Sequence, residues 1–132
     1  MTEKIAAKDI LDLLLDAESY QSWDTAPVDT RPDAAYRADL EKAAAKSGVD
    51  ESVITGCGTI RGRRVAVIAC EFSFLAGSIG VAAAQRITSA IERATAEGLP
   101  LLASPTSGGT RMQEGTVAFV QMVKIAAAVA AH

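Results

Sequence analysis

The chain has 132 residues, which is enough for one domain at most. Its 13 basic and 16 acidic side chains give a formal net charge of −3, without the basic excess that is typical of proteins that bind nucleic acid. Two cysteines without a short metal-binding spacing exclude a disulfide scaffold and a four-cysteine zinc site. The sequence shows neither an N-terminal signal pattern nor an apolar run long enough to cross a bilayer. We therefore expect a soluble cytoplasmic protein with no nucleic-acid or membrane partner.

The N-terminal part of the sequence has the pattern of two helices joined by a loop. Apolar residues at helical spacing predict an amphipathic helix over residues 3–16. Residues 18–32 mix Ser, Asp and Thr with proline and predict a loop. A second helix is expected over residues 33–47, since Pro32 precedes it and Gly48 follows it.

The rest of the sequence alternates between strand and helix patterns. Residues 53–60 and 64–72 predict two strands joined by a tight turn. A helix is expected over residues 77–98, then a short apolar strand over 99–103, a loop, and a final helix from about residue 112 onward. A strand, a helix and a second strand in this order are typical of a parallel crossover in an α/β domain.

The final helix is apolar on nearly all sides, and the whole of residues 67–132 carries only four basic and four acidic side chains. A helix without a polar face must be covered all round, and nothing else in the sequence is available to cover it. We therefore expect the chain to be one piece of a larger polypeptide or an obligate oligomer. The apolar positions are Val117, Phe119, Val120, Met122, Val123, Ile125 and Val129.

The segment Ser107–Gly115 is the strongest candidate for a functional site. It lies between a buried strand and a helix, where α/β proteins place ligand sites, and it contains consecutive glycines. Glycines let a ligand approach the backbone, and their free amides suit an anion or an oxyanion that develops during a reaction. A second glycine-rich turn, Ala76–Gly80, follows the previous strand and could add an amide to the same oxygen. The alternatives are an ordinary strand-to-helix turn for the first segment and close helix–sheet packing for the second.

Reactive side chains offer no obvious acid, base or nucleophile. The only histidine is His132, the last residue, so a serine triad that uses Ser107 is not expected. Cys57 and Cys70 have no histidine partner in the pattern and are interpreted as small buried apolar residues.

Three charged side chains lie near the glycine turns, and we expect each of them to stabilise the structure rather than to take part in a reaction. Glu71 ends a buried strand, where a capping or ion-pair role is expected. Arg111 and Glu114 are expected to brace the glycine loop. Any catalysis must then depend on backbone amides.

Three stretches together resemble the carboxyltransferase domain of acyl-CoA carboxylases, and in particular the β subunit of bacterial acetyl-CoA carboxylase. They are Glu71–Gly80 (EFSFLAGSIG), Ile87–Arg93 with Leu99-Pro100-Leu101, and Ser107–Gly115 (SGGTRMQEG) with Gln121–Lys124. The resemblance implies an α/β fold, the crotonase/ClpP-like spiral of ββα units, incomplete in this chain and preceded by N-terminal helices. It divides the chain into an N-terminal helical segment, 1–50, and the first part of the carboxyltransferase domain, 51–132.

The resemblance also implies a reaction and its participants. Carboxylate would pass from carboxybiotin, presented by a separate biotin carboxyl carrier protein, to an acyl-CoA, giving malonyl-CoA from acetyl-CoA. Gly108 and Gly109 would form a backbone oxyanion hole, while Ala76, Gly77, Ser78 and Thr110 would bind substrate. No metal is expected in this chain, and a partner carboxyltransferase half or α-type subunit is expected to complete an oligomer.

Departures from the family pattern leave other functions open. Thr110 stands where the family usually has alanine, Pro105 precedes the loop, and the four-cysteine zinc ribbon of many bacterial β subunits is missing. The sequence also stops inside an expected helix, so we expect the chain alone to be inactive. The alternatives are a decarboxylase-type subunit that acts on malonyl thioesters and a non-catalytic assembly fragment.

Overall fold

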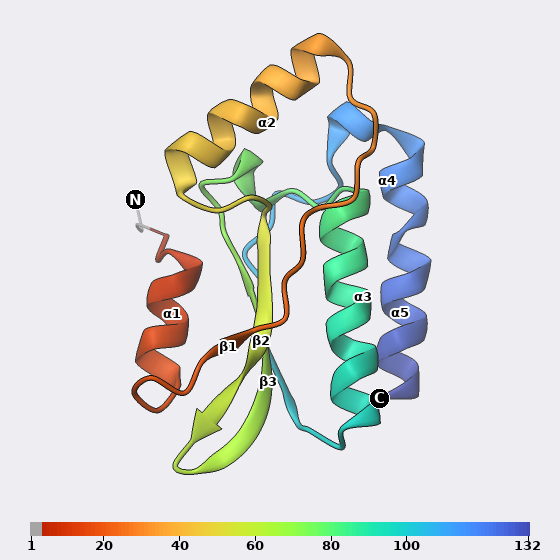
Figure 1. Cartoon of the computed structure of the whole chain (residues 1–132). Coiled ribbons are helices and arrows are strands. Elements are labelled where there is room, and N and C mark those ends of the chain that lie inside the picture. Colours follow the sequence, from red (N-terminus) through yellow and green to blue (C-terminus); the bar gives the residue numbers. More distant parts are fainter. Residues whose placement is uncertain (1–3) are drawn as a thin grey trace.

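The computed structural model describes residues 4–132 and arranges them around one four-stranded sheet. Figure 1 shows the sheet in the centre, α1 on one side of it, and α3 with α5 on the other. The helices are α1 (Ala7–Leu14), α2 (Ala34–Ser47), α3 (Val81–Ala96), α4 (Thr116–Val120) and α5 (Met122–Ala131). The strands are β1 (Gln21–Ser22), β2 (Val53–Ile60), β3 (Arg63–Cys70) and β4 (Leu101–Ser104), and two short 3₁₀ turns are η1 (Leu75–Gly77) and η2 (Met112–Glu114).

The sheet has the strand order β1-β2-β3-β4, and its last pair is parallel. The pairs β1·β2 and β2·β3 are antiparallel, whereas α3 carries the chain from β3 back to the parallel neighbour β4. The predicted strand–helix–strand crossover is thus confirmed. Because β3 and β4 run in the same direction, the segments that follow them leave the sheet at the same edge.

Alternate residues of β3 supply the cores on the two faces of the sheet, as the two-residue repeat of a strand requires. Val65, Val67 and Ala69 pack with α1 residues on one face. Ile68 and Cys70 pack on the other face with the apolar side of α3, and α5 adds Ala128 to this cluster. The sequence pattern of β3 is a continuous apolar run because both of its faces are buried.

The helix and strand predictions hold for most of the chain. The helix expected over 33–47 is α2, whose first turn is capped by the Asp33 carboxylate accepting from the Tyr36 N–H at 2.8 Å. Gly48 ends α2 with φ +76°, and Cys57 and Cys70 are buried as expected. The helix expected over 3–16 is α1, which is shorter than expected because Ala6 and Leu15 have extended backbone; residue 3 lies outside the described residues.

Several predicted segments were wrong in detail. The helix expected over 77–98 begins only at Val81, because Ala76 and Gly77 have positive φ and Ile79 pairs with Thr110 instead. The loop expected over 18–32 contains β1, which sits beside β2 because Gly56 has no side chain to collide with the Gln21 carbonyl.

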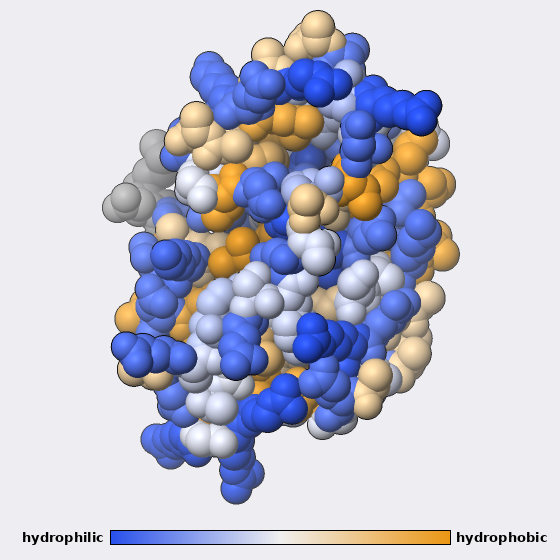
Figure 2. All heavy atoms as spheres, viewed as in Figure 1, coloured by the Kyte–Doolittle hydropathy of each residue, from blue (hydrophilic) through white to orange (hydrophobic). Residues whose placement is uncertain are grey.

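The helix expected from residue 112 onward is divided into η2, α4 and α5. Gly115, with φ +67°, separates η2 from α4, and the buried Gln121, whose backbone stays in the α region, separates α4 from α5. Much of the apolar surface of α4 and α5 is exposed, with Phe119 66% accessible, and orange residues gather over these helices at the right of Figure 2. None of the helices in the described part of the chain is both long and apolar enough to cross a membrane.

Candidate functional site

The two glycine turns meet at the edge of the sheet where β3 and β4 end. The Gly108 N–H donates to the Ala76 carbonyl at 2.8 Å, and the Ile79 N–H donates to the Gly109 carbonyl at 2.8 Å. Gly77 lies so close to the other turn that a Cβ there would collide with the Thr106 carbonyl. The structure therefore brings together the two turns that the sequence analysis considered as parts of one site, and backbone hydrogen bonds hold them in register.

The backbone amides of the two turns differ in their availability to a ligand. The Gly108 N–H is engaged by Ala76, whereas the Gly109 N–H donates only to the exposed Ser107 hydroxyl at 3.0 Å. Rotation of that hydroxyl would free the Gly109 amide. The Thr110 N–H makes no hydrogen bond to any residue of 4–132, and no atom beyond the chain neighbours lies within 4 Å of where a Gly109 Cβ would be. The donors that a ligand can reach are thus the Thr110 N–H and, once the Ser107 hydroxyl turns away, the Gly109 N–H.

A fully buried arginine lies directly behind the turns. The Arg111 side chain is 0% exposed, and its guanidinium forms an ion pair with Glu51 at 2.5 Å. It also donates to the Ser78 carbonyl at 2.7 Å and to the Ser78 hydroxyl at 3.1 Å. Burial alone would lower the pKa of Arg111, but the Glu51 carboxylate outweighs it and the pKa lies above its ordinary value. Arg111 therefore joins the start of β2 to the first glycine turn, as a bracing role requires.

Glu114 extends this network to two helices. Its carboxylate accepts from the N–H of Val81, the first residue of α3, at 2.8 Å. It also accepts from the hydroxyl of Tyr36 on α2. Gly80 is needed at the start of α3 because a Cβ there would collide with the Glu114 carboxylate. Burial and the Glu114 carboxylate raise the pKa of Tyr36 to about 12, although Arg111 acts in the opposite direction.

The Tyr36→Phe substitution is expected to lower the free energy of unfolding by about 1–2 kcal/mol at neutral pH, since Glu114 loses a buried partner. The stabilisation from Tyr36 is present below the ordinary tyrosine pKa of 10 and is lost as pH rises through its folded value of about 12. The difference between wild type and variant in urea unfolding should therefore shrink between pH 10 and pH 12. A difference that stays constant over this range would contradict the assignment.

The sequence did not point to two members of this network. Glu51 and Tyr36 lie 60 and 75 positions before Arg111, and no local pattern relates them to the glycine turns. Glu71, by contrast, has the expected capping role, since its carboxylate accepts from the Ala7 N–H at 3.1 Å at the start of α1.

Side-chain chemistry around the turns is sparse. The His132 ring contacts the Thr95 hydroxyl at 2.7 Å, near the C-terminal end of α3. The glycine turns lie at the opposite end of α3, beside its N-terminus. Within residues 4–132, no group of three or more His, Cys, Asp or Glu side chains could hold a metal ion. The arrangement is suited to stabilising negative charge on a ligand oxygen through backbone N–H groups.

Comparison with solved structures places the fold of this chain, with its paired turns on a partly parallel sheet, among the crotonase-like carboxyltransferases. The 12S subunit of transcarboxylase, solved with methylmalonyl-coenzyme A and methylmalonic acid bound, superposes with a TM-score of 0.80 and 29% identity over 95% of this chain and 23% of that one. The carboxyl transferase domain model matches residues 4–132. The chain belongs to the carboxyl transferase domain family.

Two curated relatives give the range of the similarity. A probable biotin-dependent acyl-coenzyme A carboxylase beta3 subunit of Mycobacterium bovis is 61% identical over 98% of this chain and 26% of its own length. The acetyl-coenzyme A carboxylase carboxyl transferase subunit beta 2 of Roseiflexus is 41% identical over 85% of this chain and 39% of its own length. The chain thus spans about a quarter to two fifths of the length of these relatives.

Proposed function

We propose that this chain forms the acyl-CoA side of a biotin-dependent carboxyltransferase of the β-subunit type, with acetyl-CoA as substrate and malonyl-CoA as product. The observation that carries the proposal is the meeting of the two glycine turns at the edge of the sheet where β3 and β4 end, with open space around Gly109 and its N–H held only by the exposed Ser107 hydroxyl. Membership of the carboxyl transferase family and 61% identity to an acyl-CoA carboxylase β subunit support it.

In this proposal the backbone holds the substrate oxygen on which negative charge develops. The thioester oxygen of the acyl-CoA accepts from the N–H groups of Gly109 and Thr110, while the Gly108 N–H stays bonded to the Ala76 carbonyl and holds the turn in place. Ala76, Gly77 and Ser78 form the wall against which the substrate lies. A donor placed in advance needs no reorganisation when the charge appears, and one such donor lowers the barrier by about 3–4 kcal/mol.

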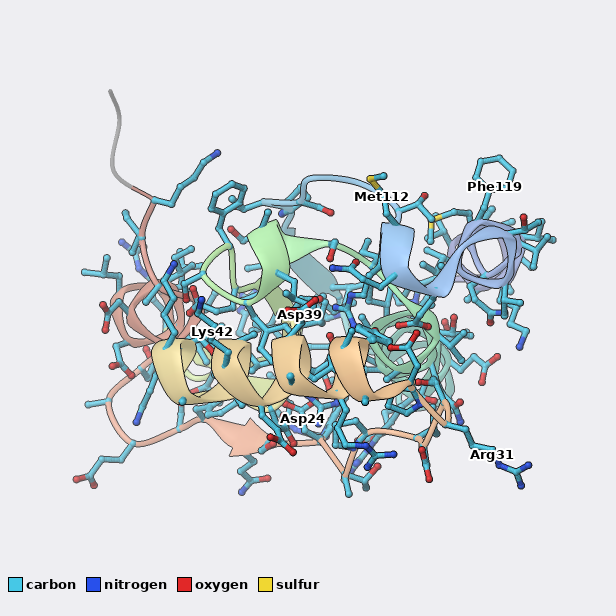
Figure 3. All side chains as sticks on the ribbon, turned by 90° about the horizontal axis from the view of Figure 1, so that it is seen from above. Asp24, Arg31, Asp39, Lys42, Met112 and Phe119 are labelled. Carbon is cyan, nitrogen blue, oxygen red and sulfur yellow. The ribbon has the colours of Figure 1, made fainter. Side chains whose placement is uncertain are left out.

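Carboxybiotin on a separate carrier protein supplies the carboxyl group when it is bound. The described residues fit one oxyanion site, built on the open space around Gly109. We place the complementary site for carboxybiotin on a partner half or α-type subunit, and the exposed apolar residues of α4 and α5 support burial of this face in an oligomer. Figure 3 shows Met112 and Phe119 projecting from the same side of the molecule.

The proposal is tested by following labelled bicarbonate into acetyl-, propionyl- and butyryl-CoA with the assembled enzyme, biotin carboxylase and the biotinylated carrier protein. We expect incorporation that depends on the carrier and is blocked by avidin. Release of CO2 from malonyl-CoA without any biotinylated carrier would instead identify a decarboxylase-type subunit. Wild-type assemblies that turn over neither substrate would identify an assembly subunit.

A further inference from the structure

The Ser107 hydroxyl makes its hydrogen bonds inside the second glycine turn. Its oxygen accepts from the Gly109 N–H at 3.0 Å and lies 3.5 Å from the Gly109 carbonyl oxygen. The side chain is exposed, so it can be reached from outside the chain. The Ser107 oxygen therefore lies where an oxygen of a ligand must lie in order to accept from the same amide.

The hydrogen of this hydroxyl has no strong acceptor among residues 4–132. A serine hydroxyl has one hydrogen to donate and two lone pairs that accept, and the Gly109 N–H takes one of the lone pairs. The contact with the Gly109 carbonyl, at 3.5 Å, is longer than the usual distance of about 2.7–2.8 Å for a hydroxyl donor. That carbonyl already accepts from the Ile79 N–H at 2.8 Å. The hydroxyl hydrogen is thus available to a better acceptor.

The hydroxyl can change its partner without disturbing the turn. An exposed serine moves its oxygen between staggered positions by rotation about one bond, within picoseconds to nanoseconds. The backbone of the turn is held independently of this side chain. The Gly108 N–H donates to the Ala76 carbonyl at 2.8 Å, and the Ile79 N–H donates to the Gly109 carbonyl. The amides of the turn therefore keep their places when the hydroxyl rotates.

We propose that Ser107 is a catalytic residue whose hydroxyl donates a hydrogen bond to the thioester oxygen of the acyl-CoA. The inference rests on the proposed function, which places that oxygen at the N–H groups of Gly109 and Thr110. The thioester oxygen replaces the Ser107 oxygen as the acceptor of the Gly109 N–H, and the rotated hydroxyl turns its hydrogen toward the same thioester oxygen. The proton stays on the serine, so the hydroxyl acts as a third donor and not as an acid or a nucleophile.

This contact has a kinetic signature. A hydrogen bond to an oxygen strengthens as negative charge develops on that oxygen. The Ser107 hydroxyl therefore stabilises the enolate more than it stabilises the bound acyl-CoA, and an interaction of this kind raises kcat rather than lowering KM.

The test compares Ser107→Ala with Ser19→Ala in the assembled enzyme. Ser19 is a matched control, because its hydroxyl also accepts from a backbone N–H, that of Thr59, at 3.1 Å and donates to a backbone carbonyl, that of Asp16, at 2.8 Å. Thr59 is near the end of β2 that precedes the β2–β3 turn, opposite the end of the sheet where the glycine turns lie.

We expect kcat for the carboxylation of acetyl-CoA to fall by about 10- to 100-fold in Ser107→Ala, which is the effect of losing one hydrogen bond to a charged group. KM should stay within about threefold, and Ser19→Ala should leave both constants unchanged. Ser107→Thr keeps a hydroxyl at this position and should restore kcat to within about threefold of wild type.

Two inhibitors show whether the lost contact is at the thioester oxygen. S-carboxymethyl-CoA carries a carboxylate at the place where the enolate oxygen develops, whereas S-ethyl-CoA has neither a carbonyl oxygen nor a charge there. Ser107→Ala should weaken inhibition by S-carboxymethyl-CoA by about tenfold and change inhibition by S-ethyl-CoA by less than about twofold. Equal weakening of both inhibitors would assign Ser107 to the structure of the site and overturn the inference.

The proposed function and this inference fail in different ways. Wild-type enzyme that does not carboxylate acetyl-CoA refutes the proposed function itself. Active wild-type enzyme together with an unchanged kcat in Ser107→Ala retains the function but removes the role of the hydroxyl as a donor. A lower KM with unchanged kcat in that variant would show that the hydroxyl only competes with the substrate for the Gly109 N–H, which also overturns the inference.

Discussion

Carboxyl transfer is expected to fall by about 100- to 1,000-fold when Gly109 is replaced by valine, which is the effect of removing one oxyanion donor in other enzymes. Gly109 has φ +107°, a conformation that side-chain-bearing residues avoid and β-branched residues avoid most strongly. A Cβ at this position meets no atom within 4 Å beyond the chain neighbours. The valine therefore fits sterically, but its backbone must rotate, which turns the N–H groups of residues 109 and 110 away from the substrate oxygen.

Gly98→Val is the matched control for this substitution. Gly98 also has positive φ, +67°, and open space around its α-carbon, but it follows α3 at the end away from the glycine turns. Both variants should lose a similar free energy of unfolding, about 1–2 kcal/mol, from backbone strain. Only Gly109→Val should lose turnover, measured as labelled bicarbonate incorporation. Normal turnover in Gly109→Val would refute the assignment of the oxyanion site.

The Arg111→Met substitution is expected to destabilise the fold by about 3–5 kcal/mol, because it leaves the Glu51 carboxylate buried without its partner. Glu51 is 2% exposed and Arg111 is 1% exposed, so water cannot replace the lost contacts. Ser78 would also lose the guanidinium that holds its carbonyl and hydroxyl. The urea midpoint of the variant should fall with little change in the slope of the transition.

Two further variants show whether the loss of stability comes from the buried, unpaired Glu51 carboxylate or simply from the loss of an ion pair. Arg64→Met removes a guanidinium whose side chain is 54% exposed and pairs with Glu97 at 3.0 Å, and it should shift the urea midpoint far less than Arg111→Met does, because water solvates both charges. Adding Glu51→Gln to Arg111→Met should recover part of the lost stability, since no uncompensated charge then remains. Equal effects of Arg64→Met and Arg111→Met would contradict the role given to the buried pair.

The regular elements were predictable where local chemistry specifies them. β2 has the predicted bounds because a tight turn follows an apolar run, and α2 has its bounds because Asp33 caps its start and Gly48 ends it. The start of α3 was not predictable from helical spacing. Ile79 has an apolar side chain at a helical position, but its backbone pairs with Thr110, a residue 31 positions away.

The candidate site also has features that the sequence predicts and features that only the tertiary structure decides. The glycines of both turns are visible in the sequence because positive φ and close approach demand them, as at Gly77. Which amide a ligand can reach was not visible, since the Ala76 carbonyl engages the Gly108 N–H rather than the Gly109 N–H. That distinction depends on how two turns from different strands face each other.

The sequence by itself determined the family, the order of the main elements and the two turns on which the site is built. These features depend on residues close together in the chain, through apolar periodicity, caps and glycine conformation. Only the tertiary structure decided that Tyr36, Glu51 and Arg111 meet behind those turns. The physical reason is that a buried charge is stable only beside a partner, and the fold can supply that partner from any part of the chain.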